Sequence, residues 1–201
     1  MPINKFLYFS DFFAIPVALT VLTYFALATG GSRAAPDFGV FLLIGLATWT
    51  LVEYAIHRFV YHHAPVFSAL HDSHHQAPNE FIGVPSFVSS GFIIVVCHFP
   101  LRILDDVAAS GFTSGMLLGY AAYMFVHHAT HHFAIQPGDW LYKARVRHMA
   151  HHYHDNANFG VSTGFWDRVF GTTGARRSRF ARTWGLPPAA RSGCASTWKT
   201  D

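Results

Sequence analysis

Four long apolar blocks, separated by short polar stretches, dominate the first two thirds of the sequence. They are roughly residues 12–28, 38–56, 84–101 and 112–126. A helix needs about 20 apolar residues to cross a bilayer core, with a range of about 17–25. Three blocks meet that length, and the fourth is expected to continue as a helix into the polar residues after it. Four such blocks leave too little polar sequence to coat a soluble bundle, so we predict an all-α membrane protein with about four transmembrane helices.

The composition agrees with this prediction and excludes other classes. Of the 201 residues, 51% are hydrophobic and 12% are charged, and the net charge is +3. A nucleic-acid-binding protein would present a basic face with stacking aromatic residues, so we expect no nucleic acid partner. Cys97 and Cys194 are isolated and fit neither a disulfide framework nor a thiolate metal site. We expect one membrane-embedded domain, residues 1–173, and a polar, partly disordered tail, residues 174–201.

The distribution of cations gives the helices an orientation. Lys and Arg accumulate on the cytosolic side of membrane proteins. Here most of them follow the second and fourth blocks or lie in the tail, with Arg33 and Arg102 as exceptions, whereas the loop expected at 105–111 carries none. Two crossings separate the second and fourth blocks, so both are expected to end on the cytosolic face. The first block could instead be a signal peptide ending at Ala-Leu-Ala, residues 26–28, which leaves this topology unchanged.

Histidine is the most unusual component, with 15 residues, 12 of them in four clusters. The clusters are HRFVYH at 57–62, HDSHH at 71–75, HHATHH at 127–132 and HMAHH at 148–152. In His-x-x-His-His, positions i, i+3 and i+4 share one face of a helix, so the three imidazoles point together. Neutral imidazoles are the commonest metal ligands in proteins. The clusters therefore predict a metal centre on the cytosolic face.

Two spacings leave alternatives open. His127 with His131 and His128 with His132 are both i, i+4 pairs, so either face of that helix could bind metal. His57 and His62 are five residues apart and point in different directions on an α-helix. Either they serve two different metals or the helix loosens between them. Imidazole suits iron, zinc, copper and nickel alike. Ten or so imidazoles exceed the needs of one ion, so two ions with about five ligands each are the natural division.

The order H-x4-H, H-x2-HH, H-x3-HH, H-x2-HH, with a long hydrophobic hairpin between the second and third motifs, resembles the fatty acid hydroxylase / sterol desaturase superfamily. The closing HMAHHYHDNANFGVSTGFWDRVFGT, residues 148–172, is most similar to the fatty acid 2-hydroxylase branch. The resemblance covers roughly residues 38–173. It implies these metal ligands: His57, His62, His71, His74, His75, His127, His131, His148, His151 and His152.

The resemblance also implies the chemistry. The superfamily comprises membrane-embedded, iron- and dioxygen-dependent enzymes that hydroxylate or desaturate lipids. We therefore expect a multi-pass integral membrane oxidoreductase with two Fe ions on the cytosolic face, sites that Zn can occupy in preparations. The expected reaction inserts oxygen from dioxygen into a C–H bond of a long acyl chain, at carbon 2. No haem, flavin or nicotinamide domain is evident, so we expect a separate electron donor protein, either a small cytochrome or a ferredoxin with its reductase.

Two other functions remain open at this stage. A carotenoid or sterol hydroxylase or desaturase would use the same site. A histidine-rich membrane metal transporter is a different class, but it would need ionisable ligands near mid-bilayer. Here the histidines cluster at the ends of the apolar blocks, and only His98 lies inside one.

Five polar residues near the clusters are candidates for supporting roles. Asn156 and Asn158 are predicted to hydrogen-bond ligand imidazoles or a bound oxygen species. Asp155 and Asp167 are predicted to accept an N–H from a ligand histidine. Turn formation is the competing explanation for Asp155 and Asn156. Glu53 stands near the end of an apolar block, where an ionisable group is costly. We expect it to pair with a ligand histidine or with Arg58.

Overall fold

A computed structural model describes residues 3–174, which fold into helices joined by short loops, with no β-strand in that range. The all-α prediction is therefore confirmed. The predicted tail, after residue 174, lies outside the described residues. The elements, in chain order, are α1 (Lys5–Tyr8), α2 (Asp11–Thr29), η1 (Gly31–Arg33), α3 (Ala34–Ala55), η2 (Ile56–Tyr61), α4 (Pro65–Gln76), α5 (Ser86–Ile93), η3 (Ile94–His98), α6 (Phe99–Leu101), α7 (Asp106–His132), α8 (Tyr142–Tyr153) and α9 (Phe165–Val169).

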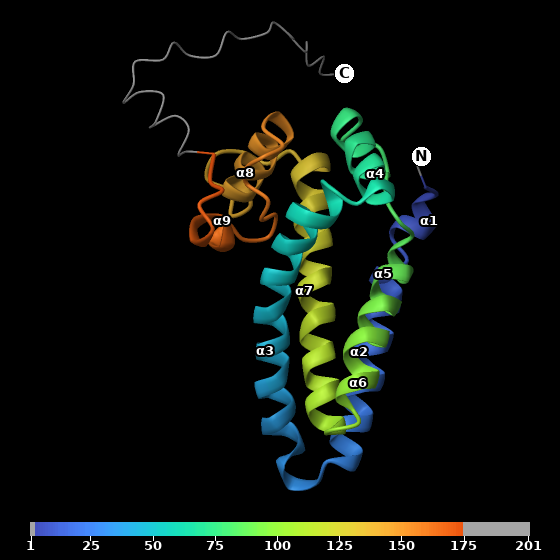
Figure 1. The fold of residues 1–201 in the computed structure, drawn as a ribbon. Helices are drawn as coiled ribbons and strands as arrows, with labels where there is room; N and C mark the ends of the chain where they lie inside the picture. The colour runs from blue at the N-terminus through green and yellow to red at the C-terminus, as the bar shows by residue number, and fades with distance from the viewer. Residues whose placement is uncertain (1–2, 175–201) are drawn as a thin grey trace, which may run out of the picture.

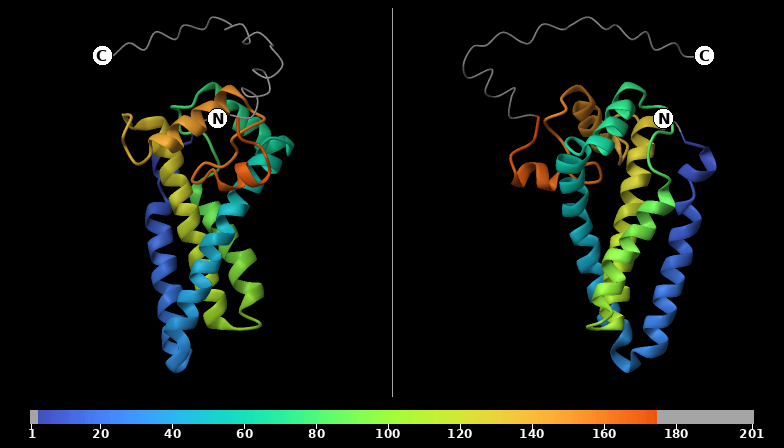
Figure 2. Two further views of the ribbon diagram at one scale, coloured as in Figure 1. Left: turned by 90° about the vertical axis from the view of Figure 1, so that its left-hand side faces the viewer. Right: turned by 45° about the vertical axis from the view of Figure 1, so that its right-hand side comes forward.

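The long helices run lengthwise through the molecule in four antiparallel passes, formed by α2, by α3, by α5 with η3 and α6, and by α7 (Figure 1). Two rotated views show the same arrangement, with the remaining helices gathered as a cap at one end (Figure 2). The connections α2–α3 and α6–α7 lie at the opposite end. The ends of α3 and α7 that carry histidines therefore meet at the cap, as the sequence pattern predicts.

Helix α7 is the central pass and packs most closely on α3. Three of its glycines, spaced four residues apart, face α3. A Cβ added at Gly115 would lie 2.1 Å from the carbonyl oxygen of Leu42, and one at Gly111 would lie 2.5 Å from that of Phe38. A Cβ added at Gly119 would lie 2.5 Å from the Cβ of Trp49, also in α3. Small residues at this spacing allow two helix backbones to come into direct contact, a common device in membrane proteins.

The start of α7 differs from the sequence prediction. Residues 105–111 are predicted as a loop, but the helix begins at Asp106. The side chain of Asp105 accepts a hydrogen bond from the backbone N–H of Ala108 at 2.7 Å, so it caps the helix. The first turns are therefore helical and packed, and Ser110 is only 2% exposed. At its other end α7 continues to His132, which confirms that the fourth block extends into polar sequence.

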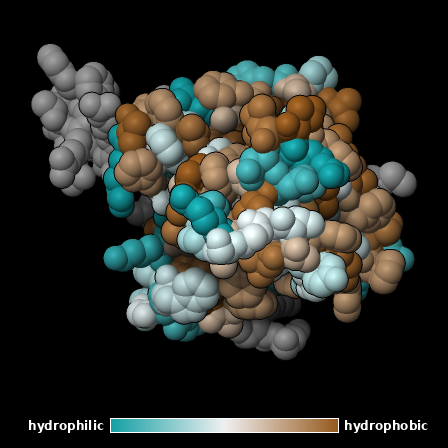
Figure 3. Space-filling view, turned by 90° about the horizontal axis from the view of Figure 1, so that it is seen from below, coloured by the Kyte–Doolittle hydropathy of each residue, from teal (hydrophilic) through white to brown (hydrophobic). Residues whose placement is uncertain are grey.

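The exterior of the bundle is strongly apolar. The helical stretches Lys5–Thr29 and Gly31–Tyr61 are long and apolar enough to cross a membrane, and Phe87–Leu101 is a shorter apolar helix. Side chains such as Leu43 and Phe92 are each 65% exposed. Seen from the end opposite the cap, hydrophobic residues occupy much of the surface, with polar residues gathered across its middle (Figure 3). Such a surface indicates a membrane-embedded protein.

Candidate metal centre

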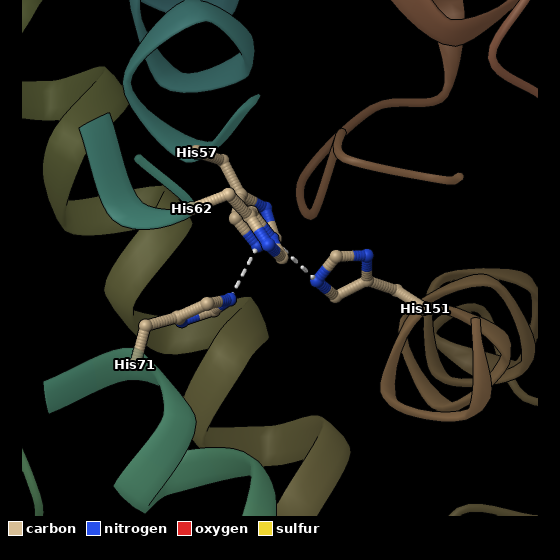
Figure 4. A group of neighbouring side chains, drawn as sticks. All are labelled: His57, His62, His71 and His151. Carbon is tan, nitrogen blue, oxygen red and sulfur yellow. Dashed lines mark hydrogen bonds between the residues drawn. The ribbon is translucent and has the colours of Figure 1, made fainter. Parts of the chain in front are cut away.

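The cap brings together histidines from four elements: η2, α4, α7 and α8. Eight of them form two groups of four. Within each group, one ring nitrogen of every residue lies within 4.8 Å of those of the other three. The first group is His57, His62, His71 and His151, and the second group is His74, His131, His148 and His152. All eight were predicted as ligands from the sequence. The first group draws on η2, α4 and α8, as Figure 4 shows.

A widened helical turn explains how two residues five apart reach one site. Helix α3 runs directly into η2, which is a π-helix with i to i+5 hydrogen bonding. The His57 and His62 rings consequently stack on the same side, with centroids 5.5 Å apart. Of the two alternatives for this pair, loosening of the helix is the one that the structure adopts.

Each His-x-x-His-His motif contributes to both groups. In α4, His71 belongs to the first group and His74 to the second, and their ring centroids are 6.3 Å apart. In α8 the order is reversed, because His148 belongs to the second group and His151 to the first. The three imidazoles of a motif share a helix face but do not converge on a single point, so each motif links the two groups.

The two remaining predicted ligands lie beside these groups. The ring of His75 stacks on that of His152, with centroids 4.2 Å apart. The ring of His127 lies 4.7 Å from those of His74 and His148. The alternative pair on α7 faces elsewhere, since the rings of His128 and His132 stack on each other and on Phe81.

The ring nitrogens are placed as metal binding requires. Nε2 of His57 lies 3.2 Å from Nε2 of His71, and Nε2 of His62 lies 3.3 Å from Nε2 of His151 (Figure 4). In the second group, Nε2 of His148 lies 2.8 Å from that of His131 and 3.3 Å from that of His152. Nitrogens bound tetrahedrally at about 2.0–2.1 Å from one ion are about 3.4 Å apart.

Backbone carbonyls decide which nitrogen of two of these rings carries the proton. Nδ1 of His57 lies 2.5 Å from the carbonyl oxygen of Phe159, and Nδ1 of His151 lies 2.8 Å from that of Ala157. A carbonyl oxygen only accepts, so each Nδ1 donates its proton. Each Nε2 then presents a lone pair to the other nitrogens of the first group. Lone pairs that converge in this way repel one another unless a cation lies among them, so the residues fit a bound metal.

Two buried ring nitrogens without partners and the low pKa values of the imidazoles support the same interpretation. Nε2 of His74 and Nε2 of His75 are buried and have no hydrogen-bond partner within residues 3–174. Burial lowers the pKa of His74 and of His151 to about 4, and that of His152 to about 2. These imidazoles are therefore neutral at pH 7, and no proton competes with a metal for their lone pairs.

The predicted supporting residues occupy different positions. Asp155 is largely exposed, and its carboxylate lies 3.2 Å from Nδ1 of His75. Asn156 is exposed on the turn after α8. Asn158 is buried, and its side chain accepts from the backbone N–H of Gly174 at 3.0 Å. Asp167 and Glu53 are buried but do not contact the histidines; they accept hydrogen bonds from the backbone of residues 159–162. Arg58 instead donates to the hydroxyl of Tyr54 at 2.8 Å.

A cavity of about 180 Å³ adjoins the centre. One side is formed by histidines of both groups, including His57, His71 and His74. Much of the rest is apolar and includes Phe12, Leu70, Ile82, Val84 and Met124. Tyrosines and a serine also line it: Tyr8, Tyr61, Ser89, Tyr120 and Tyr123. An apolar chain could therefore lie in this cavity with one carbon beside the histidines.

Comparison with known proteins gives a consistent result. A family model described as fatty acid hydroxylase matches residues 42–172. The ceramide very long chain fatty acid hydroxylase scs7 of Schizosaccharomyces pombe is 37% identical over 148 residues, which cover 67% of this chain and 42% of that protein. The fatty acid 2-hydroxylase of Rattus norvegicus is 36% identical over 149 residues, covering 67% and 39%. This chain thus matches only about two fifths of the length of these relatives.

Two further matches cover more of the compared protein. The dihydroceramide fatty acyl 2-hydroxylase FAH2 of Arabidopsis thaliana is 28% identical over 181 residues, covering 84% of this chain and 76% of that protein. A solved structure described as full-length scs7p, with only the hydroxylase domain visible, superposes with a TM-score of 0.68. It is 26% identical and covers 85% of this chain and 70% of that one. The residues matched by the family model, 42–172, include all four histidine clusters.

Proposed function

Because this chain belongs to the fatty acid hydroxylase family, we propose that it is a lipid hydroxylase that inserts oxygen into a C–H bond of a long acyl chain. The observation that carries this proposal is the pair of four-histidine groups beside a largely apolar cavity. In the proposed reaction, dioxygen takes up two electrons and two protons. One oxygen atom becomes the new hydroxyl group, and the other leaves as water.

We further propose that the two groups hold two iron ions, with His75 and His127 completing the ligand set. Bound iron would supply the activation of dioxygen, which an imidazole cannot perform alone. The chain's own residues have other tasks. Neutral imidazoles hold the ions, carbonyls of the segment after α8 orient the rings, and the apolar wall positions one carbon and excludes water. We propose supporting contacts by Asp155 and Asn156, and electron supply by a separate small cytochrome or ferredoxin system.

The substrate proposal rests on the depth of the site. The elements that carry the two histidine groups meet at one end of the four passes, not at their middle (Figure 1). If the passes cross the bilayer, this end lies at headgroup level, where the carboxyl end of an acyl chain is found. Carbon 2 can then reach the centre without the chain leaving the membrane. The names of the relatives, fatty acid 2-hydroxylase and dihydroceramide fatty acyl 2-hydroxylase, support this position and a free or lipid-linked fatty acid as substrate.

Expression in a host that lacks hydroxylated fatty acids, with an electron donor supplied, tests the function. Mass spectrometry of hydrolysed lipids is expected to show acyl chains that gain one oxygen atom at carbon 2. His74→Ala should abolish the product, because it removes a buried ring of the second group. If acyl chains stay unmodified while co-expressed carotenoids or sterols gain oxygen, the substrate proposal fails. Metal uptake without any oxygenated product would favour the transporter.

We propose that all four passes span the membrane, that residues 1–173 form the embedded domain followed by a polar tail at 174–201, and that the cap is cytosolic. Helix α7 need not be as apolar as the others, since its neighbours cover it on several sides. In a chain with Cys97→Ala and Cys194→Ser, a membrane-impermeant maleimide added to intact cells should label Ser32→Cys, on the α2–α3 connection. It should label Tyr153→Cys, which is 83% exposed on the cap, only after lysis. Labelling of both in intact cells would contradict the topology.

A further inference from the structure

Two carboxylates near the metal centre are buried although neither contacts a histidine. Glu53, in α3, is 3% exposed, and Asp167, in α9, is fully buried. A buried carboxylate is costly unless hydrogen bonds satisfy its charge. Glu53 accepts from the backbone N–H groups of Val161 and Ser162, both at 2.8 Å, and from the hydroxyl of Ser162. Asp167 accepts from backbone N–H groups in the same segment. Their charges are therefore used to hold one short piece of chain.

That piece is the segment 157–162, which has no regular secondary structure of its own. Asp167 accepts from the N–H of Phe159 at 2.8 Å and of Gly160 at 2.9 Å. Arg147, in α8, donates to the carbonyl oxygen of Gly160 at 2.7 Å and to that of Val161. A Cβ at Gly160 would lie 2.0 Å from the carbonyl oxygen of Thr163, so only glycine fits this path. Side chains thus bind both backbone N–H groups and backbone carbonyl oxygens of this segment.

The two carbonyls of this segment that remain directed at the metal centre contact only the first group. Ala157 accepts from His151, and Phe159 accepts from His57. In the second group, Nδ1 of His148 is buried and has no hydrogen-bond partner among the described residues. The two carboxylates therefore hold residues 159–162, and the backbone of the same segment carries the two carbonyls that accept from rings of the first group.

We propose that Glu53 and Asp167 are positioning residues for the metal of the first histidine group alone, and that they act through the carbonyls of Ala157 and Phe159. This inference rests on the proposed two-metal function. As a consequence, a substitution outside the ligand set can lower the affinity for one ion and leave the affinity for the other unchanged. Groups that orient metal ligands typically contribute about 10–100-fold to metal affinity when they are intact.

The test is a Zn²⁺ titration of the purified, metal-depleted chain against a competing fluorescent chelator. The unchanged protein should bind about two Zn²⁺ ions per chain. Glu53→Gln or Asp167→Asn is expected to lower the affinity for one Zn²⁺ ion by about 10–100-fold and to leave the affinity for the other within about threefold. Ser162→Ala removes one hydrogen bond to Glu53 and should act in the same direction with a smaller loss. Glu80→Gln, at an exposed carboxylate in the loop after α4, is the control and should change the binding of neither ion.

Ligand variants identify which ion is affected. His131→Ala leaves the first group complete, so adding Glu53→Gln should weaken the remaining tight ion. His62→Ala leaves the second group complete, and there Glu53→Gln should have no effect. Equal weakening of both ions, or of neither, by the carboxylate variants would overturn this inference while leaving the proposed function intact. An unchanged chain that binds fewer than two ions would overturn both.

Discussion

His151→Ala should lower turnover by about a thousandfold or more and reduce the metal content from about two ions per chain towards one. The substitution removes a fully buried imidazole of the first group and leaves the carbonyl of Ala157 without its donor. Because the remaining imidazoles are buried and neutral, no nearby ring can replace it. Product formation by mass spectrometry and metal content by elemental analysis measure the two effects.

The same helix end supplies the control. His154 follows α8 directly, is exposed and belongs to neither group. His154→Ala should retain about two ions and turnover within about twofold, since a surface substitution away from such sites changes little. Full activity with two ions in His151→Ala would show that His151 is not a ligand. A comparable loss in both variants would point to damage of α8 as a whole.

Gly115→Ala is expected to cause the largest loss of stability among single methyl additions to the bundle. The new Cβ would lie 2.1 Å from the backbone carbonyl of Leu42, and backbone cannot move aside without separating α3 from α7. Overpacking of this kind costs about 1–3 kcal/mol or more. At the size of this chain, about 2 kcal/mol corresponds to a fall of about 4–8 °C in the thermal unfolding midpoint.

The matched variant has the opposite expected sign. Gly39 lies in α3, and a Cβ added there would meet nothing within 4 Å. Alanine is a better helix former than glycine by about 0.5–1 kcal/mol, so Gly39→Ala should leave the unfolding midpoint unchanged or raise it slightly. Thermal unfolding of both variants in the same detergent provides the comparison. Equal midpoints would mean that the α3–α7 contact can relax around an added methyl group.

The lengths of the apolar blocks predict most of the helices of the bundle. This criterion fails where two helices pack through small residues instead of large apolar ones. The first block, predicted at 12–28, corresponds to α2 at Asp11–Thr29, because an uninterrupted apolar run has few other solutions. The first turns of α7 were predicted as a loop because they contain small and polar residues. They are buried by close backbone approach at Gly111 and Gly115, which an apolar-block criterion does not detect.

The candidate site shows a similar division. The predicted topology places the histidine clusters at one end, and the structure brings them together there. The number of imidazoles predicts two ions, but which histidine belongs to which group could not be predicted, since it depends on how α4 and α8 face each other across the cap. The carbonyls of Ala157 and Phe159 leave no signal in the sequence, because every residue carries a carbonyl. Glu53 was recognised as unusual, but its partner is the backbone of residues 161 and 162 and not a histidine or Arg58.

The π-helical turn η2 accommodates one extra residue between two members of the first group. In an α-helix, residues five apart differ in direction by about 140°, whereas residues four apart differ by about 40°. The widened turn lets the His57 and His62 rings lie on one side although five positions separate them. A one-residue deletion between them would let the turn close as ordinary α-helix and would keep both rings on one face. Closure of the turn as α-helix without a deletion would instead turn the two rings apart by about 140°.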